Sequence, residues 1–553
     1  MYLLIIFFIS LLLTVFFTPF FIEYFTKRKI IDLPCERRIN TSAIPRMGGL
    51  IIYLNTILCI ISFYGNLNEI RFFILGSALL LIVGIIDDIK QLNHEKKFAA
   101  QFITAMLLMV FLSPTYSTIT LFGLTLPSGV DKIVLLIFII GVINAINLYD
   151  GLDGLVTGFS LLVTFVAFLI GWQAGDKLLL ILSASLIGSL IGFLKYNAFP
   201  ARIFLGDSGS LTLGFFLITA ALISSTNTVS KNIDLTFSII LLGVPVIDTL
   251  KVIAIRLLHR KNIFHPDKSH VHHIILGSEI KHRLTVFILQ SFALTFTVAA
   301  LYYQRYSETA GIILFILLAG LLLAIKRLLL LYKKFGKYIP FKHVYLKFPQ
   351  YVITFFGKFL LPVFSVCSLL ILVGLMPLNS SVNNFLIFLS LIFVITLLAF
   401  SVVNLQKEKK ISDILVFFNF IIFLIYSNYS VNISNIFSQL GIHVFNPRVL
   451  LIYVTLPVIV FFLFFRDRLM AKKIILFTGI DLIIAVFIVL FSISSTLLPT
   501  SPEISTLNTV LFHSFLLYIF YKIITIVKIQ YQPALYYLSF IIPLAALIRL
   551  LLH

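Results

Sequence analysis

Residues 132–154 read KIVLLIFIIGVINAINLYDGLDG, an apolar run that ends in amides, carboxylates and glycines. The run is long enough to cross a bilayer as a helix, which takes about 20 apolar residues. The polar side chains recur every three residues, so a helix that continues through them carries them on one face. This stretch predicts a membrane span that ends in a polar site. The side chains concerned are Asn144, Asn147, Asp150 and Asp153.

The composition of the whole chain extends this pattern. Of its 553 residues, 60% are apolar and 12% are charged. Soluble domains are about half apolar and a quarter charged, so a water-soluble enzyme is excluded. The apolar runs predict an all-α polytopic membrane protein with about 18 transmembrane helices. The runs lie near residues 2–22, 47–64, 71–86, 98–113, 132–148, 155–172, 177–194, 208–226, 235–255, 284–303, 309–330, 359–376, 383–403, 411–427, 449–465, 474–494, 507–527 and 534–552.

Positive charge is distributed unevenly between successive loops. Up to residue 358, the loop after the first predicted helix and every second loop after it hold about 25 Lys and Arg, against five in the intervening loops. By the positive-inside rule, the richer loops are cytoplasmic and the N-terminus is outside. The net charge of +20 thus reflects multi-pass topology in the cell (inner or plasma) membrane. The lipid bilayer is an expected partner, and nucleic acid is not.

Two parts of the chain differ in their loops. In residues 1–330, which predict about eleven helices, the loops expected in the cytoplasm are rich in Asp, Asn, His and Gly. Residues 331–358 form a basic, aromatic linker typical of a membrane surface. Residues 359–553 predict about seven more helices, in a membrane domain of unknown function. Within the first part, the alternating residues 117–130 predict a short hairpin.

The first polar cluster is the acidic pair Asp87 and Asp88, which closes an apolar run in the sequence GIIDD. Polar groups are costly near hydrocarbon, so such clusters invite a functional interpretation. Adjacent carboxylates repel each other, and a bound Mg²⁺ or a cationic partner such as Lys97 relieves that repulsion. The alternative is a solvated helix end without a function.

The second cluster is residues 144–154, NAINLYDGLDG. Asn and Asp oxygens suit a hard cation. Gly151 and Gly154 let the backbone turn tightly and approach a ligand. We therefore expect Asn144 and the polar residues that follow it to bind substrate or metal, and an ordinary helix terminus is the alternative.

The third cluster is residues 197–214, NAFPARIFLGDSGSLTLG, in which Asp207 directly precedes an apolar run. Asp, Ser and Gly at such a position are good helix caps. The same geometry also presents backbone N–H groups to a phosphate. Both interpretations are open at this point.

The fourth cluster is the basic loop at residues 256–273, RLLHRKNIFHPDKSHVHH. Cationic and neutral donors at this density suit a diphosphate. A solvated basic loop is one alternative, and a zinc site is another, although no cysteine lies nearby. The candidate ligands are Arg256, Arg260, His270, His272 and His273.

The fifth cluster is residues 37–49, RRINTSAIPRMGG. Pro45 and two glycines punctuate a loop that could carry Arg38 and Arg46 toward the same site. Ordinary positive charge on a cytoplasmic loop is the alternative.

Together the five clusters supply acids and amides for a metal, basic groups for phosphates, and a membrane setting. No Ser-His-Asp or Cys-His arrangement is evident in the sequence. The reaction class that fits is phosphoryl transfer between a soluble nucleotide and a lipid acceptor.

These motifs resemble those of the polyprenyl-phosphate N-acetylhexosamine-1-phosphate transferases. The GIIDD, NAINLYDGLDG, FLGDSGS and PDKSHVHH motifs occur in the order and spacing of that family over about residues 1–330. The resemblance implies transfer of a sugar phosphate from a UDP-N-acetylhexosamine to undecaprenyl phosphate, with release of UMP, to start a cell-envelope glycan. The HVHH ending resembles the branch that uses UDP-N-acetylglucosamine. Asn40 departs from the pattern, because many members carry a basic residue or histidine there.

The resemblance also implies roles for single residues. The acidic pair would activate the lipid phosphate or support the metal, and Lys97 would contact a phosphate. Mg²⁺ is the implied cofactor, with Mn²⁺ as an alternative. Its implied ligands are Asn147 and Asp207, while Asp150 and Asp153 would line the nucleotide site and Asn197 and Phe204 the uridine pocket. The residues implied to close over the sugar diphosphate are Arg256, Arg260, His270, His272 and His273.

Two rival interpretations belong to other classes. A transporter or polymer-handling protein would place ionisable groups within its spans; Asp248 is the main such group before residue 284, and residues 359–553 keep this rival open. A purely structural membrane protein would leave the five polar clusters unexplained. The sequence leaves assembly into a homo-oligomer open.

Overall fold

The computed structural model describes residues 2–32, 43–227, 230–260 and 269–335, together with 514 and 517–519. The chain divides into two units, Met1–Pro340 and Phe341–His553, and the fold below is that of the first. Apart from residues 514 and 517–519, the helices expected after residue 358 lie outside the described residues, as do most of the basic linker, Arg38 and Asn40.

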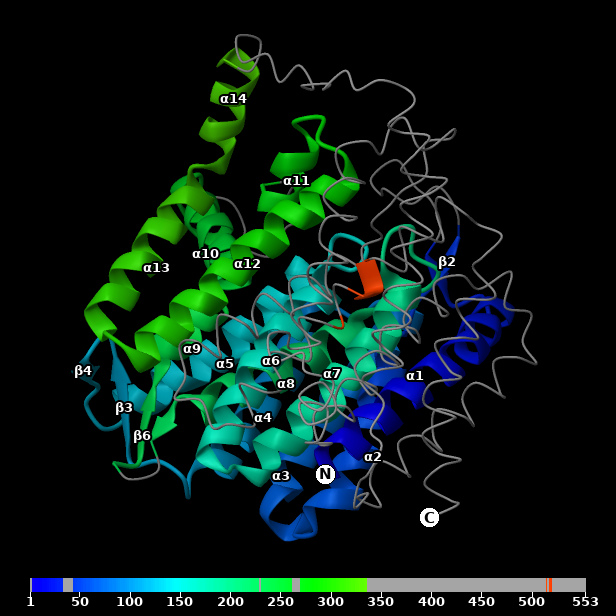
Figure 1. The fold of residues 1–553 in the computed structure, drawn as a ribbon, viewed down its shortest axis with the longest axis horizontal. Helices are drawn as coiled ribbons and strands as arrows, with labels where there is room; N and C mark the ends of the chain where they lie inside the picture. Colours follow the sequence, from blue (N-terminus) through cyan, green and yellow to red (C-terminus); the bar gives the residue numbers. More distant parts are fainter. Residues whose placement is uncertain are drawn as a thin grey trace, which may run out of the picture. The chain divides into compact units, whose positions relative to one another are not determined.

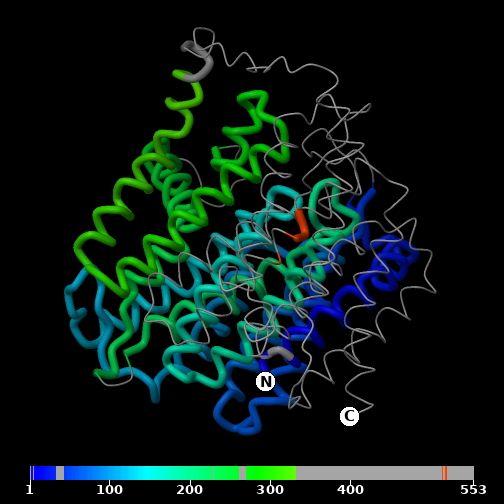
Figure 2. The backbone as a smooth tube through the Cα atoms, in the orientation of Figure 1, coloured from blue at the N-terminus to red at the C-terminus, as the bar shows by residue number. Residues whose placement is uncertain are grey.

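The first unit is a helical bundle (Figure 1). Helices α6, α7 and α8 form its core, because they are apolar on nearly every side and almost wholly buried. Helix α7 packs against α1, α2 and α6, and α8 packs against α3 and α5 (Figure 2). The helices are α1 (Tyr2–Lys27), α2 (Gly49–Tyr64), α3 (Leu67–Lys90), α4 (His94–Leu112), α5 (Val130–Tyr149), α6 (Leu155–Ala174), α7 (Lys177–Asn197), α8 (Asp207–Ser224), α9 (Leu235–Leu241), α10 (Gly243–Leu258), α11 (Val271–Leu276), α12 (His282–Arg305), α13 (Glu308–Leu323) and α14 (Ile325–Phe335).

Each of the eleven runs predicted before residue 331 contains helix, but two of them are not single straight spans. In the described part of the chain, seven helices are long and apolar enough to cross a membrane, or up to nine if each bent pair is one span. Helices α9 and α10 meet at 90°. The reason is Pro245, which lacks an N–H and fits a helix only in its first turn, so a new helix begins at Gly243.

The second bent pair is α13 and α14, which meet at 58°. The break precedes Lys326 and Arg327, where the apolar run gives way to charge. Helix α11 was not predicted at all, because six residues within a polar loop carry no apolar periodicity.

A small sheet covers one end of the bundle. The predicted hairpin is confirmed: β3 (Thr118–Leu121) pairs antiparallel with β4 (Leu124–Thr125). The sequence did not predict that β3 also pairs in parallel with β6 (Asn232–Asp234), which pairs with β5 (Thr226–Asn227). A shorter pair, β1 (Ile31–Asp32) and β2 (Ile44–Pro45), lies near the other end.

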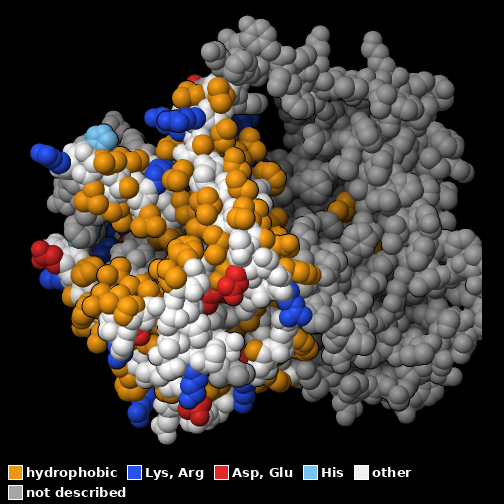
Figure 3. Space-filling model, turned by 90° about the vertical axis from the view of Figure 1, so that its left-hand side faces the viewer, with side chains coloured by type: hydrophobic (Ala, Val, Ile, Leu, Met, Phe, Trp, Pro, Cys, Tyr) orange, Lys and Arg blue, Asp and Glu red, His pale blue; other side chains and the backbone are white. Residues whose placement is uncertain are grey.

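The exterior of the described bundle is apolar. Figure 3 shows hydrophobic side chains over much of the described part of one face, with charged groups sparse among them. Ile137, Ile316 and Leu317 are each 60% or more exposed. A patch this extensive on a soluble protein would drive association, so the surface confirms a protein that is solvated by lipid.

Candidate active site

The polar clusters meet where α3, α5 and α7 end and α4, α6 and α8 begin; we call this the site end of the bundle. Two glycines permit the close crossings there. A Cβ on Gly84 of α3 would lie 2.4 Å from the Cα of Ser208, and one on Gly49 of α2 would lie 1.9 Å from the Cα of Gly209. Helices α2 and α3 therefore touch the backbone of α8 directly, which brings the acidic pair to the start of α8.

Asp88 satisfies the N-terminus of α8. Its Oδ1 accepts from the backbone N–H of Asp207 at 2.9 Å, and its Oδ2 accepts from the N–H and hydroxyl of Ser208 at 3.0 and 2.7 Å. The first N–H groups of a helix have no partner within the helix. Asp88 supplies that partner from another helix, so it fixes α3 and α8 relative to each other.

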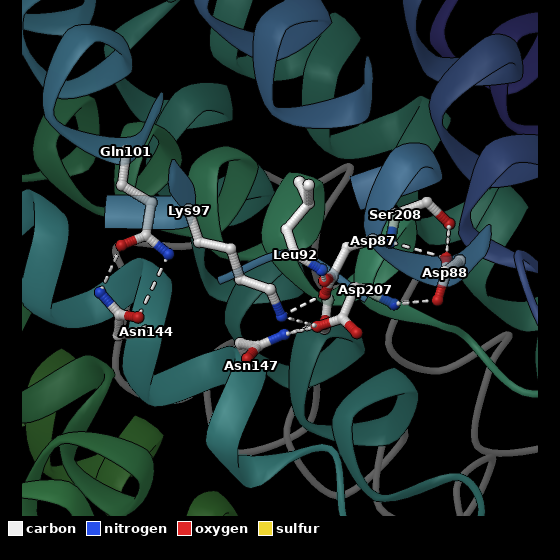
Figure 4. A network of polar contacts seen from close by, with 10 residues as sticks. Asp87, Asp88, Leu92, Lys97, Gln101, Asn144, Asn147, Asp207 and Ser208 are labelled. Atoms are coloured by element: carbon white, nitrogen blue, oxygen red, sulfur yellow. Dashed lines mark hydrogen bonds and ion pairs between the residues drawn. The ribbon is translucent and has the colours of Figure 1, made fainter. Parts of the chain in front are cut away.

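Lys97 is placed between two carboxylates. Its ammonium group forms an ion pair with Asp87, and its Nζ lies 3.6 Å from Oδ1 of Asp207 (Figure 4). The same Asp207 oxygen accepts from Nδ2 of Asn147 at 2.6 Å, and that amide also donates to Ser210 at 2.8 Å. Predicted residues from α3, α4, α5 and α8 thus form one network.

Asp150 and Asp153 follow α5 in the loop that leads to α6. Burial, followed by the charges of Asp207, Asp88 and Asp153, raises the pKa of Asp150 to about 8. Burial also raises the pKa of Asp153, although its carboxylate accepts from the N–H of Ala201 at 2.9 Å. Carboxylates therefore face one another here with too little compensating positive charge.

Asn197 and Phe204 position the loop before α8. The Asn197 side chain accepts from Thr157 at 2.7 Å and donates to the carbonyl of Ile203 at 3.0 Å, so its amide holds this loop in place. The backbone of Phe204 pairs with Pro45 and Gly48. This pairing brings the segment around β2 to the site, where Arg46 lines the cavity and forms an ion pair with Asp32.

A cavity of about 380 Å³ opens among these residues. It is of the size of small-molecule sites, which start near 300 Å³. Of the predicted residues, its walls include Arg46, Asp88, Asn147, Asp150, Asp153, Asn197, Phe204, Asp207 and His273.

The three predicted histidines occupy different places. His273 lines the cavity, while His270 and His272 are buried behind it. His272 packs on the loop after α5, since a Cβ on Gly151 would lie 2.4 Å from its Nε2. Burial lowers the pKa of His272 to about 3, so this imidazole is neutral. Arg256 and Arg260, at the end of α10, are not among the cavity-lining residues.

Asn144 is not among the cavity-lining residues and pairs with Gln101. Its Nδ2 donates to Oε1 of Gln101 at 2.6 Å, and Nε2 of Gln101 donates back to Oδ1 of Asn144 at 3.1 Å (Figure 4). This reciprocal pair ties α4 to α5. It lies one turn from Lys97 on one helix and one turn from Asn147 on the other.

Some cavity-lining residues were not predicted. Asp32, Ser210 and His282 belong to the wall. The ring of His282 stacks on Phe199 at 4.4 Å between centroids. Ser210 stands inside the GDSGS motif and could have been found there, but single polar residues such as Asp32 and His282 carry no pattern that would identify them.

The donor set fits a hard divalent cation. The cavity walls carry Asp32, Asp88, Asp150, Asp153 and Asp207, whereas Arg46 is already paired with the first of these. Within the described residues, no group of three histidine, cysteine or acidic side chains is placed to hold a metal ion. Mg²⁺ does not need one, because it usually binds through one or two carboxylates, waters and substrate phosphates. Asp207 and Asn147, the ligands implied by the resemblance, both line the cavity, and Nδ2 of Asn147 donates to Oδ1 of Asp207.

Comparison with known proteins identifies relatives over the part of the chain that forms this site. Residues 70–225, which include most of the network, match the family described as glycosyl transferase family 4. Over 321 residues the chain is 33% identical to a probable undecaprenyl-phosphate N-acetylglucosaminyl 1-phosphate transferase of Bacillus subtilis, covering 56% of this chain and 87% of that protein.

Two further relatives show how far the similarity extends along the chain. An undecaprenyl-phosphate alpha-N-acetylglucosaminyl 1-phosphate transferase of Thermotoga maritima is 31% identical over 295 residues, 53% of this chain and 89% of the relative. A phospho-N-acetylmuramoyl-pentapeptide-transferase of Clostridium botulinum is 33% identical over only 231 residues, 39% of this chain and 69% of the relative. The likeness thus extends further along the N-acetylglucosaminyl relatives, which agrees with the branch favoured by the HVHH motif.

Proposed function

The chain is a membrane transferase that belongs to glycosyl transferase family 4, and we propose that it moves N-acetylglucosamine 1-phosphate, or a related N-acetylhexosamine 1-phosphate, from a UDP-sugar to undecaprenyl phosphate. UMP is the second product, and the lipid-linked sugar would start a cell-envelope glycan. The observation that carries the proposal is the position of Lys97 between Asp87 and Asp207, because Asp207 lines an acidic cavity at the end of a lipid-solvated bundle.

The reaction is an in-line displacement at phosphorus. A non-bridging oxygen of the lipid phosphate attacks the sugar-linked phosphorus of the UDP-sugar. The bond from that phosphorus to the bridging oxygen breaks, and UMP leaves with this oxygen. In phosphoryl transfer the protein contributes mainly positioning and electrostatic stabilisation, and the residues of this site are suited to both.

Mg²⁺, or Mn²⁺ in its place, would be held by Asp207 and Asn147 and would neutralise charge on the diphosphate. The chain's own groups do the rest. Lys97 supplies a fixed positive charge next to the reacting phosphates, and Asp87 keeps that ammonium group in place. His273, which lines the same cavity, contacts the sugar diphosphate. Asp88 keeps α8, and with it Asp207, in register.

The proposed setting is the plasma membrane, with the site end toward the cytoplasm. The support is the bias of Lys and Arg to the loops at this end, which the positive-inside rule places in the cytoplasm. A nucleotide-sugar dissolved in the cytoplasm then reaches the cavity directly, and the lipid phosphate reaches it from the same membrane surface.

The test is UMP release by the purified full-length chain with undecaprenyl phosphate, UDP-N-acetylglucosamine and Mg²⁺. Release is expected only when both substrates and the metal are present, and parallel reactions with Mn²⁺ and with UDP-N-acetylgalactosamine define the metal and the sugar. UMP release without the lipid, or none with any of these donors, would contradict the proposal.

A further inference from the structure

Asp248 is an acid buried within the membrane-embedded part of the chain. It lies on α10, one turn after the helix begins at the break with α9, and its side chain is 2% exposed. The sequence singled it out as the group that best suited a transporter. An isolated buried carboxylate is costly, so its partners should explain why it is there.

The partners of Asp248 come mainly from the histidine loop. Oδ1 accepts from the backbone N–H of Val271 at 2.9 Å, and Oδ2 lies 2.9 Å from Nδ1 of His270. The third partner, Lys251, is on α10 itself, with its Nζ 3.3 Å from Oδ1. The carboxylate therefore joins the broken span to the residues that begin α11.

Helix α11 carries this anchor to the cavity. Its backbone starts at the anchored residues, where the N–H of Ile274 donates to the carbonyl of His270. One turn later His273 stands on the cavity wall, with its ring 4.2 Å from that of His272 between centroids. His272 in turn packs against Gly151. A shift of the anchored end would move both imidazoles relative to the acidic side of the cavity.

We infer that Asp248 is a positioning residue: by holding His270 and Val271 it sets where α11 presents His273 to the sugar diphosphate. The inference rests on the proposed function, and it assigns a different role to each of the three histidines in the HVHH motif. His270 is the attachment point, His272 is the packing contact, and His273 is the residue that meets substrate. Asp248 acts through this motif and does not touch substrate itself.

The experiment is a double-mutant cycle between Asp248→Asn and His273→Ala in the full-length chain, read as kcat and KM for UDP-N-acetylglucosamine. Each single change is expected to raise KM about tenfold, and the double variant to be only about as impaired as His273→Ala alone. Losses that multiply to about a hundredfold would overturn the inference, since independent sites are additive in free energy.

Two further variants keep the test decisive. If Asp248→Asn does not fold, His270→Gln breaks the same contact from the other side and must show the same coupling to His273→Ala. Asp131→Asn is the matched control: this aspartate is also buried, but it accepts from Gly129 and Lys132 at the opposite end of α5. It is expected to leave KM unchanged even if it lowers the melting temperature.

The results distinguish failure of the proposed function from failure of the role assigned to Asp248. If the wild-type chain releases no UMP at all, the proposed function fails. If the wild type is active and His273→Ala has no effect on KM, or the cycle is additive, the transferase assignment stands and the role given to Asp248 is wrong.

Discussion

The two ends of the bundle use the same kind of residue in opposite ways. At the end opposite the site, Asp176 accepts from the N–H of Leu179, and Asp234 accepts from Thr236 and from the hydroxyl of Tyr303. Asp176 caps α7, and Asp234 caps α9 while also accepting from Tyr303 of α12, so hydrogen-bond donors satisfy both carboxylates. At the site end, Asp150 lies near Asp207, Asp88 and Asp153, and the negative charges of these three acids oppose its ionisation.

The difference separates structural acids from functional ones. A helix cap contributes about 0.5–2 kcal/mol to stability and needs only the N–H groups of its own helix. Carboxylates that face each other lower stability and persist where a ligand compensates them. Asp207 occupies the first turn of α8 and resembles a cap in the sequence, but its contacts are Lys97 and Asn147.

The largest expected effect comes from replacing one aspartate at each end of the bundle with asparagine. Asp207→Asn removes the charge that is proposed to hold the metal and that lies 3.6 Å from the Lys97 ammonium group, so we expect kcat to fall by at least about a thousandfold. Asp176→Asn, at the N-cap of α7, should change kcat less than about twofold and leave stability nearly unchanged, because Asn caps a helix about as well as Asp. Steady-state UMP release and thermal melting of both variants measure this. Substantial turnover by Asp207→Asn would show that the acids at the site end are no more important for catalysis than those at the opposite end.

The same comparison can be made with lysines. Lys97→Met keeps length and volume but removes the charge beside Asp87 and Asp207, and a loss of about a hundredfold in kcat is expected. Lys177→Met is the control, because Lys177 donates only to the carbonyl of Tyr64 on an exposed part of the opposite end. Equal kcat values for the two variants would show that the charge of Lys97 does not contribute to catalysis.

Substitutions in the amide pair of Gln101 and Asn144 distinguish a structural role of Asn144 from a role in substrate binding. Asn144→Leu leaves a buried amide of Gln101 without its partner and should destabilise the protein by about 1–3 kcal/mol. Gln101→Leu with Asn144→Leu removes both amides and should recover most of the melting temperature, with KM for the UDP-sugar within a few-fold of wild type. A KM raised as much in the double variant as in the single one would instead support the substrate contact predicted from the sequence.

The smallest effect concerns the pH dependence of stability. Because burial lowers the pKa of His272 to about 3, the unfolded chain binds a proton between pH 3 and 6.5 that the folded chain does not. Stability therefore rises with pH over this window and is lost on acidification, by about 1.4 kcal/mol at pH 5.5. The charged and titratable neighbours that contribute are His273, Asp248, His270 and Lys251.

The measurement is the difference in melting temperature between pH 7.5 and 5.5. His272→Gln should show a smaller difference than the wild type, and His94→Gln, which changes an exposed histidine at the start of α4, serves as the control. An unchanged difference in the His272 variant would show that this imidazole is protonated in the folded chain.

Much of the site could be predicted because its residues stand in local motifs. Apolar runs place helix ends, and Asp88, Asn147 and Asp207 each sit at such an end, so their meeting follows from antiparallel packing. What could not be predicted depends on pairing between distant segments. Nothing in the sequence indicates that Asn144 pairs with Gln101, or that Asp248 pairs with His270.

The fold shows the same limit. The hairpin of β3 and β4 is local and was predicted, whereas β6 joins β3 from more than a hundred residues away. The break between α9 and α10 was missed because the run 235–255 is largely apolar on both sides of the break, and only the place of Pro245 marks it. Local periodicity predicts the helices, and it says little about which buried polar groups meet.

The most direct test of the central claim follows the β-phosphate of the donor. UDP-N-acetylglucosamine labelled with ³²P at the sugar-linked phosphate is incubated with undecaprenyl phosphate, Mg²⁺ and the full-length chain, and lipid and nucleotide are separated. Sugar-phosphate transfer predicts that the label enters the lipid and that one UMP appears for each labelled lipid. If the label stayed in released UDP, the chain would transfer the sugar alone, and the phosphoryl-transfer account of this site would be wrong.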